Sequence, residues 1–77
     1  MEIKVFASIK EKIGSDTIDL FVGDSITVGE LKNHIFVDYP ELDGEVFQVA
    51  KNEAFVKDDE VVTSDDALAL IPPVSGG

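Results

Sequence analysis

The chain has 77 residues, of which 44% are apolar and 29% charged, and it contains no cysteine. This length is typical of one small domain, whose core leaves few residues for a catalytic site of its own. The lack of cysteine excludes disulfides and cysteine-ligated metals. Sixteen acidic residues against six lysines give a net charge of −10, which disfavours binding to nucleic acid or to an anionic membrane surface.

The acidity of the chain has two interpretations. It favours association with a basic protein partner, or it only keeps a small protein in solution. No membrane span is predicted, because the longest unbroken apolar run, 67–71, is far shorter than the roughly 20 residues that a spanning helix needs. The first residues lack the pattern of a signal peptide. Together with the absence of cysteine, this predicts a cytoplasmic protein.

The first predicted element is a strand over residues 2–9, because apolar and polar side chains alternate along it. A polar turn over residues 10–15 follows and contains Gly14. A second alternating segment, 17–22, predicts another strand. Two strands joined by a short loop indicate an antiparallel hairpin.

A helix is predicted to begin after Thr27. Thr27 and Glu30 have the spacing of a capping box, and Ile26 and Leu31 have that of a hydrophobic staple. Pro40 ends the helix, because the residue before a proline is driven out of helical geometry. Apolar residues at helical spacing predict one buried stripe, formed by Val28, Leu31, Ile35 and Tyr39.

The segment after this helix predicts a hairpin. Residues 41–45 are expected to form a loop or a single helical turn. Two short strands follow, over 46–51 and 54–56. Asn52-Glu53 between them predicts a tight turn, because asparagine tolerates a positive φ.

An acidic connection over residues 57–66, which contains the Val61-Val62 pair, leads to the last predicted strand at 67–71. The order ββαβ(β)β indicates the α+β class, with one main helix on one face of a mixed sheet of four to five strands. A β-grasp arrangement fits this order, with the first and last strands adjacent and parallel at the centre. The domain is therefore expected to span residues 1–71, followed by a flexible tail over 72–77.

The tail is expected to form an extended arm. The Pro72-Pro73 pair cannot continue a sheet ladder and favours a polyproline conformation, and six residues reach up to about 20 Å. Gly76 and Gly77 carry no side chains, so they fit a passage too narrow for other residues. The arm would deliver the terminal carboxylate to the active site of another protein; the simpler interpretation is a frayed chain end.

Three segments resemble the small subunit of molybdopterin synthase, a member of the ubiquitin-like, β-grasp sulfur carriers. They are "FASIKEKIG" (6–14), "FQVAKNEAFV" (47–56) and the ending "ALIPPVSGG" (69–77). The sequence departs from the family pattern at Lys51, where an apolar residue is usual. It departs again at Ser64-Asp65-Asp66, which replaces a turn that commonly contains glycine.

The resemblance implies a carrier that is not catalytic alone. An activating enzyme related to the ubiquitin E1 family, an adenylyltransferase and sulfurtransferase, would transfer AMP from ATP to Gly77. Sulfur would then displace AMP and leave a thiocarboxylate. The large synthase subunit would receive the tail, and a pyranopterin precursor would take the sulfur to form the molybdopterin dithiolene. Gly77 would carry the chemistry and Gly76 would give access. The carrier itself would bind no cofactor, and the activating enzyme would consume the ATP.

Two other functions share the tail and its activation. One is a ubiquitin-like modifier that forms isopeptide bonds through Gly77. The other is a sulfur carrier for the thiazole of thiamine, against which the diproline ending argues.

A docking patch is predicted from the alternation of side chains along the strands. If the helix covers one sheet face, Phe6, Phe21 and Ile71 lie together on the opposite face, where exposed apolar groups suit a partner. The same partner, the large subunit, would contact the tail through Pro72, Pro73, Val74 and Ser75.

Ordinary catalysis and metal binding have little support elsewhere in the chain. His34 is the only histidine, so it has no second histidine and no cysteine with which to build a metal or nucleophilic site. The carboxylate pairs Asp58-Asp59 and Asp65-Asp66 are interpreted as solvated turn residues. No metal site is therefore expected.

Overall fold

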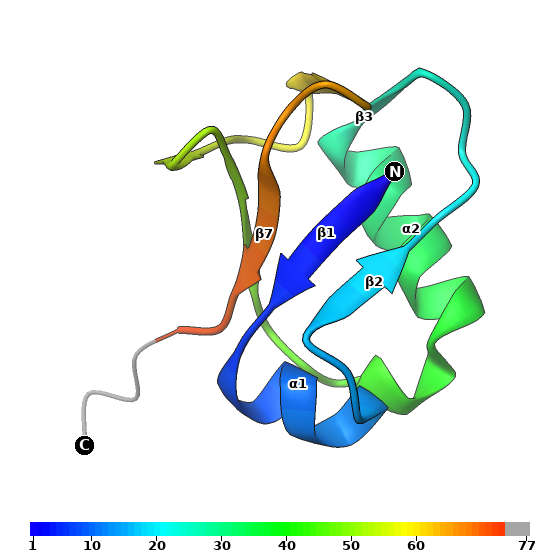
Figure 1. The fold of residues 1–77 in the computed structure, drawn as a ribbon, viewed down its shortest axis with the longest axis vertical. Coiled ribbons are helices and arrows are strands. Elements are labelled where there is room, and N and C mark those ends of the chain that lie inside the picture. Colours follow the sequence, from blue (N-terminus) through cyan, green and yellow to red (C-terminus); the bar gives the residue numbers. More distant parts are fainter. Residues whose placement is uncertain (74–77) are drawn as a thin grey trace.

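The computed structural model describes residues 1–73, and its central feature is a five-stranded mixed sheet with strand order β2-β1-β7-β4-β5. Helix α2 packs against one face of this sheet (Figure 1). In chain order the elements are β1 (Glu2–Val5), α1 (Ala7–Ile13), β2 (Thr17–Asp19), β3 (Ser25–Thr27), α2 (Val28–Asp38), the 3-10 turn η1 (Pro40–Leu42), β4 (Gln48–Lys51), β5 (Ala54–Phe55), β6 (Val61–Thr63) and β7 (Leu68–Ile71).

The first and last strands lie side by side and parallel at the centre of the sheet. Ile3 pairs with Leu68 and Val5 with Leu70. The strand pairs β1–β2, β4–β5 and β4–β7 are antiparallel. The predicted β-grasp arrangement is therefore confirmed, including its parallel central pair.

The core lies between the sheet and α2, and it is made of alternating strand residues and the apolar stripe of the helix. Val28, Leu31 and Ile35 of α2 are fully buried, as their spacing predicts. Side chains two apart along a strand share a face, so the inner face consists of every second strand residue. The buried sheet residues in this cluster are Ile3, Val5, Ile18, Val49, Leu68 and Leu70.

The start of α2 is fixed as the sequence predicts. The Thr27 hydroxyl accepts a hydrogen bond from the Glu30 amide at 3.2 Å and donates one to Glu30 Oε1 at 2.8 Å. The glutamate thus reaches the hydroxyl of the cap residue. Two further amides at this end donate to carbonyls of the acidic connection, Val28 to Glu60 and Gly29 to Asp58, both at 2.9 Å. Four hydrogen bonds therefore fix this end of the helix.

The predicted strand over residues 2–9 is wrong after Val5. The chain turns at Ala7, whose φ is 51°, and forms helix α1, which ends at Gly14 with a φ of 71°. The Gly14 amide closes the helix by donating to the Lys10 carbonyl at 2.9 Å. Ile9 is buried in the helix, as it would have been in a strand, so the alternation of apolar residues did not distinguish the two.

The acidic connection contains a strand that the sequence analysis missed. Residues 61–63 form β6, which pairs with β3 in a separate two-stranded antiparallel sheet, with Ile26 opposite Val62. The turn predicted at Asn52-Glu53 is confirmed, with φ values of 52° and 73°, the signature of a tight hairpin turn. Within residues 1–73, neither helix is long and apolar enough to cross a membrane.

Candidate docking face and C-terminal arm

The sheet face opposite α2 is open, and one row of side chains crosses its four neighbouring strands β1, β7, β4 and β5. The register places Lys4 of β1 beside Ala69 of β7, Ala69 beside Ala50 of β4, and Ala50 beside Phe55 of β5. Because side chains alternate between faces, this row lies on the face that carries none of the buried core residues Val5, Leu70 and Val49. The middle of the row thus has only methyl side chains.

A groove of about 600 Å³ runs over this row. Phe6 and Phe55 are among the residues that line this groove. Both are largely exposed to solvent, Phe6 to 45% and Phe55 to 62%. The lining residues are Glu2, Lys4, Phe6, Ala50, Glu53, Phe55, Ser64, Asp66, Ala67, Leu68, Ala69 and Ile71. The groove is therefore apolar along its floor and mostly acidic among its charged groups.

Of the three residues predicted to form the docking patch, the structure brings two together. Phe6 and Ile71 line the groove, but Phe21 does not. The antiparallel register pairs Glu2 with Asp19, and the Leu20 amide donates to the Met1 carbonyl at 2.9 Å. Phe21 therefore lies beyond the start of β1, whereas Phe6 follows its end, and Phe21 is 93% exposed. The predicted grouping of Phe21 with Phe6 and Ile71 is wrong.

The C-terminal residues follow the central strand β7. Ile71 is the last strand residue, Pro72 is half-buried and Pro73 is exposed. Val74, Ser75, Gly76 and Gly77 lie outside the described residues. Since β7 runs parallel to β1, the chain leaves the sheet at the end where α1 begins (Figure 1).

Comparison with known proteins identifies the family. The model of the ThiS family matches residues 3–77. The chain belongs to the ThiS family. It is 37% identical to the molybdopterin synthase sulfur carrier subunit of Dictyostelium discoideum, over 99% of this chain and 94% of that protein. It is 34% identical to small archaeal modifier protein 1 of Haloferax volcanii, over the full length of both. A crystal structure of the Haloferax volcanii modifier superposes with a TM-score of 0.80 at 35% identity, covering 99% and 97% of the two chains.

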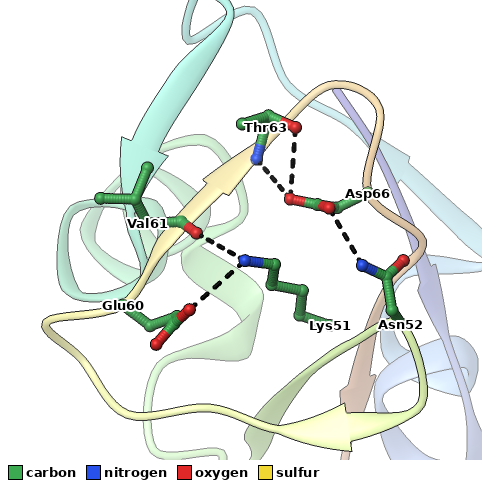
Figure 2. Close-up of polar contacts among 6 residues, drawn as sticks. All are labelled: Lys51, Asn52, Glu60, Val61, Thr63 and Asp66. Atoms are coloured by element: carbon green, nitrogen blue, oxygen red, sulfur yellow. Dashed lines mark hydrogen bonds and ion pairs between the residues drawn. The ribbon is translucent and has the colours of Figure 1, made fainter.

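The two departures from the sulfur-carrier pattern lie in two neighbouring sets of polar contacts (Figure 2). Lys51 pairs with Leu68 on the inner side of the sheet, so its aliphatic stem takes the place of an apolar side chain at the core edge. Its ammonium group reaches out and donates to Glu60 Oε2 at 3.3 Å and to the Val61 carbonyl at 3.1 Å. Lys51 thus connects β4 to β6.

Asp66, in the other departure, closes the turn before β7. Its Oδ2 accepts from the Thr63 amide at 2.8 Å and from the Thr63 hydroxyl at 3.2 Å. Its Oδ1 accepts from the Asn52 side-chain amide at 3.0 Å. The Thr63 amide first, and then Asn52, hold the pKa of Asp66 below its ordinary value. The Asp66 carboxylate therefore stabilises, by hydrogen bonding, a turn in which the family pattern commonly has a glycine.

Asn52 links the β4–β5 hairpin to β7. Its amide donates to the Ala67 carbonyl at 2.8 Å, and its side-chain oxygen accepts from the Ala67 amide at 2.9 Å. With the bond to Asp66, three hydrogen bonds fix the hairpin that carries Phe55. The sequence analysis predicted the turn but had no signal for these contacts.

A second carboxylate ties α1 to the loop before β4. Glu45 Oε2 lies 3.1 Å from Lys12 Nζ, and Glu45 Oε1 accepts from the Ser8 hydroxyl at 3.0 Å. The Lys12 contact, followed by the Ser8 hydrogen bond, lowers the pKa of Glu45. This pair holds the helix that follows Phe6 in place.

The remaining candidate residues lie on the surface or stabilise the fold. His34 is exposed on α2. Asp58 forms an ion pair with Lys32 at 2.8 Å, which together with its carbonyl contact to Gly29 ties the acidic connection to α2. Among residues 1–73, no three histidine or acidic side chains are arranged to hold a metal ion.

Proposed function

We propose that this protein is the sulfur-carrier subunit of a molybdopterin synthase and that Gly77 carries the sulfur as a thiocarboxylate. The observation that supports this most strongly is the ending Ala69 to Gly77, which continues from the central strand of a fold shared with the family. Full-length similarity to sulfur carrier subunits from four organisms adds to it. Those proteins are subunits of a synthase by name, which supports a large subunit as partner.

The proposed chemistry begins with activation of the terminal carboxylate. A Gly77 oxygen attacks the α-phosphorus of ATP and releases pyrophosphate, so that a poor leaving group, oxide, is replaced by AMP. A sulfur nucleophile then attacks the carbonyl carbon and expels AMP, leaving a C-terminal thiocarboxylate. An E1-like adenylyltransferase performs both steps and consumes the ATP. This chain supplies the acyl group and the surface by which the enzyme holds it.

The second stage delivers sulfur to the large synthase subunit. A thiocarboxylate sulfur is a better nucleophile at neutral pH than a carboxylate oxygen, so it forms a C–S bond to the pyranopterin precursor and displaces an oxygen substituent. Water then cleaves the acyl–sulfur bond, which leaves the sulfur on the pterin and restores the Gly77 carboxylate. Gly76 and Gly77 fit a narrow passage because they lack side chains. Phe6, Ile71, Pro72, Pro73, Val74 and Ser75 form the proposed contact with the large subunit. Phe21 is left out of this surface because it lies at the other end of β1.

Reconstitution tests this proposal. The chain is prepared with a C-terminal thiocarboxylate and mixed with the large subunit of the same organism and the pterin precursor. We expect one dithiolene sulfur to appear for each thiocarboxylate consumed, and none with the ordinary carboxylate form. Binding without any transfer of sulfur would contradict the proposal.

A ubiquitin-like modifier is the second candidate function. The 34% identity and the TM-score of 0.80 to small archaeal modifier protein 1 favour it. The test is mass spectrometry of tryptic peptides from cell extracts, searching for lysines joined to the Gly77 carboxyl group by an isopeptide bond. Conjugates that disappear when Gly77 is deleted would support this function, alone or beside sulfur transfer.

A further inference from the structure

The outer edge of β2 forms one margin of the central sheet. β2 is the last strand in the order β2-β1-β7-β4-β5, and within residues 1–73 it pairs only with β1. The main-chain groups on its far side therefore have no neighbouring strand. A free strand edge of this kind presents amide and carbonyl groups that can pair with another chain.

The register of the β1–β2 pair determines which main-chain groups point outward. The Leu20 amide donates to the Met1 carbonyl at 2.9 Å, so these two residues form a hydrogen-bonded pair. Hydrogen-bonded and non-hydrogen-bonded pairs alternate along an antiparallel ladder. The next pair, Asp19 with Glu2, is therefore of the second kind. The amide and carbonyl of Asp19 point away from β1, toward the free edge.

Thr17 and Phe21 lie two residues to either side of Asp19, so their main-chain groups point the same way. The Thr17 amide already donates to Ser15 Oγ at 3.3 Å. In the described part of the chain, the Thr17 carbonyl, both groups of Asp19 and the Phe21 amide have no hydrogen-bond partner on this side. These groups can accept and donate hydrogen bonds along one added strand.

The side chain of Phe21 is held outward beside this edge. Leu20 is fully buried and Val22 packs against the core, so the residues on both sides of Phe21 are fixed. The ring between them is 93% exposed. Edge strands in natural proteins usually avoid exposed apolar groups, because these favour pairing with other chains. A fixed aromatic ring beside free main-chain groups indicates a contact for a partner.

The charges along this edge indicate the chemistry of that partner. Asp16, Asp19 and Asp24 are exposed, and the sequence has no lysine or arginine within 13–31. Among the residues that pair with β2, Lys4 is the only cation. A basic segment is attracted to such an edge. A second copy of this chain, with a net charge of −10, is repelled.

We propose that the free edge of β2 binds an extended, basic segment of another protein as an added strand, with Phe21 packing against an apolar side chain of that segment. Hydrogen bonds to the Thr17 carbonyl, to Asp19 and to the Phe21 amide provide the affinity. Lysine or arginine side chains of the segment face the Asp19 carboxylate. None of these three residues lines the groove, so the inference is independent of the proposed function.

The main test measures binding of the full chain to a peptide of about eight residues, in which lysine and valine alternate. Alternation places the lysines on one face of the added strand and the valines on the other. We expect binding that weakens as the salt concentration rises, with the largest changes in NMR amide shifts at residues 17–21. Peptides with glutamate in place of lysine, or with proline in place of valine, should not bind. No binding of the lysine–valine peptide would overturn the inference.

Asp19→Pro tests the main-chain contacts. It removes an amide that points outward, where proline is tolerated on an edge strand, and leaves the hydrogen bonds to β1 in place. Asp19→Ala is the matched control, because it loses the same carboxylate, including its contact with the Met1 nitrogen at 3.4 Å, but keeps the amide. We expect the proline variant to bind the peptide about tenfold more weakly than the alanine variant. Equal affinities would overturn the inference.

A second pair of variants applies if Asp19→Pro fails to fold. Phe21→Ser removes the exposed ring, and Val37→Ser removes an apolar group that is 76% exposed on α2. We expect a loss of about fivefold or more for Phe21→Ser and no change for Val37→Ser, with the same circular dichroism spectra. Equal binding of these two variants would also overturn the inference.

Two further measurements identify the occupant of the edge. The full chain should sediment as a monomer; a dimer that Phe21→Ser dissociates would show that a second copy covers the edge, and would overturn the inference. Deletion of Gly77 should leave peptide binding unchanged while it abolishes sulfur transfer. Peptide binding without sulfur transfer by the unaltered chain would reject the proposed function alone, and sulfur transfer without peptide binding would reject this inference alone.

Discussion

The two faces of the central sheet are built from the same strands, but their side chains have different surroundings. On the inner face, Val5, Leu70 and Val49 are fully buried and pack against α2. On the outer face, their neighbours Lys4, Ala69 and Ala50 line an uncovered groove. Residues 1–73 cover only one face of the sheet. Under the proposed function, alternate residues of one strand stabilise the fold and contact the partner. Substitutions on the two faces should therefore change either the free energy of unfolding or the affinity for the partner.

The largest effect is expected beyond both faces, at the end of the arm. Deletion of Gly77 should abolish sulfur transfer in the reconstituted synthase, because the acyl group that is activated is removed. The free energy of unfolding should stay unchanged, because the core formed by residues 1–73 extends no further along the chain than Leu70. Urea unfolding and the sulfur-transfer assay, run on the same preparation, check this. Activity in the truncated chain would refute the role of Gly77.

On the inner face, Leu70→Ala should destabilise the fold. Leu70 is fully buried between β1 and β4, and truncation of a buried leucine to alanine costs about 2–5 kcal/mol. In a domain of this size, that is a large part of the total stability. Thermal unfolding is the measurement. An unchanged midpoint would mean that this face does not form the core.

On the outer face, Phe6→Asp should leave the stability of the fold nearly unchanged but weaken binding to the large subunit. Phe6 is 45% exposed and lines the groove, so the unfolding midpoint should hardly move. The new charge would have to be desolvated against the large subunit, and binding should weaken by about tenfold or more. Titration calorimetry measures the affinity, and Phe21→Asp is the matched control, because its ring lies at the other end of β1. Unchanged affinity for Phe6→Asp would remove this residue from the docking face.

The smallest effect concerns the polar network that supports the groove. Hydrogen bonds lower the folded-state pKa of Asp66 below its ordinary value of 3.8. A lowered pKa means that the carboxylate stabilises the fold above the unfolded-state value, and that this contribution disappears as the pH falls through the folded-state pKa. Asp66→Asn should therefore lower stability at pH 7 and flatten its decline in acid.

Asp65→Asn is the control for the network. In the described part of the chain, the Asp65 carboxylate accepts no hydrogen bond, so its replacement should leave the acid unfolding profile unchanged. Urea unfolding at several pH values measures both variants. Identical profiles for the two would show that the Asp66 contacts do not stabilise the hairpin.

Local features of the fold were predictable from the sequence, and features that depend on distant pairing were not. The Thr27 cap and the Asn52-Glu53 turn are set by neighbouring residues, so their sequence signals were sufficient. Helix α1 was missed because Ile9 and Ile13 fit both a strand and a helical period, and only the turn at Ala7 separates the two. The β3–β6 pair was missed because it joins Ile26 to Val62 across the whole of α2.

In the candidate site, too, local features were predictable from the sequence and features that depend on distant pairing were not. Alternation along β1 and β7 correctly placed Phe6 and Ile71 on one face. It failed for Phe21, because a position along the strand depends on the register, which alternation alone does not give. Phe55, Ala50 and Ala69 were overlooked for a related reason. Neither the phenylalanine nor the two alanines can be assigned to one surface until the pairing of β5, β4 and β7 places them in one row.

The most direct test of the central claim is the chemical state of the C-terminus in the native protein. The chain is purified from its own organism under mild conditions, and the mass of its C-terminal peptide is measured. We expect a fraction of the molecules to carry one sulfur in place of one oxygen, located at Gly77, and this fraction should disappear when the activating enzyme is deleted. A carboxylate at Gly77 in every molecule, in cells that make molybdopterin, would contradict the account.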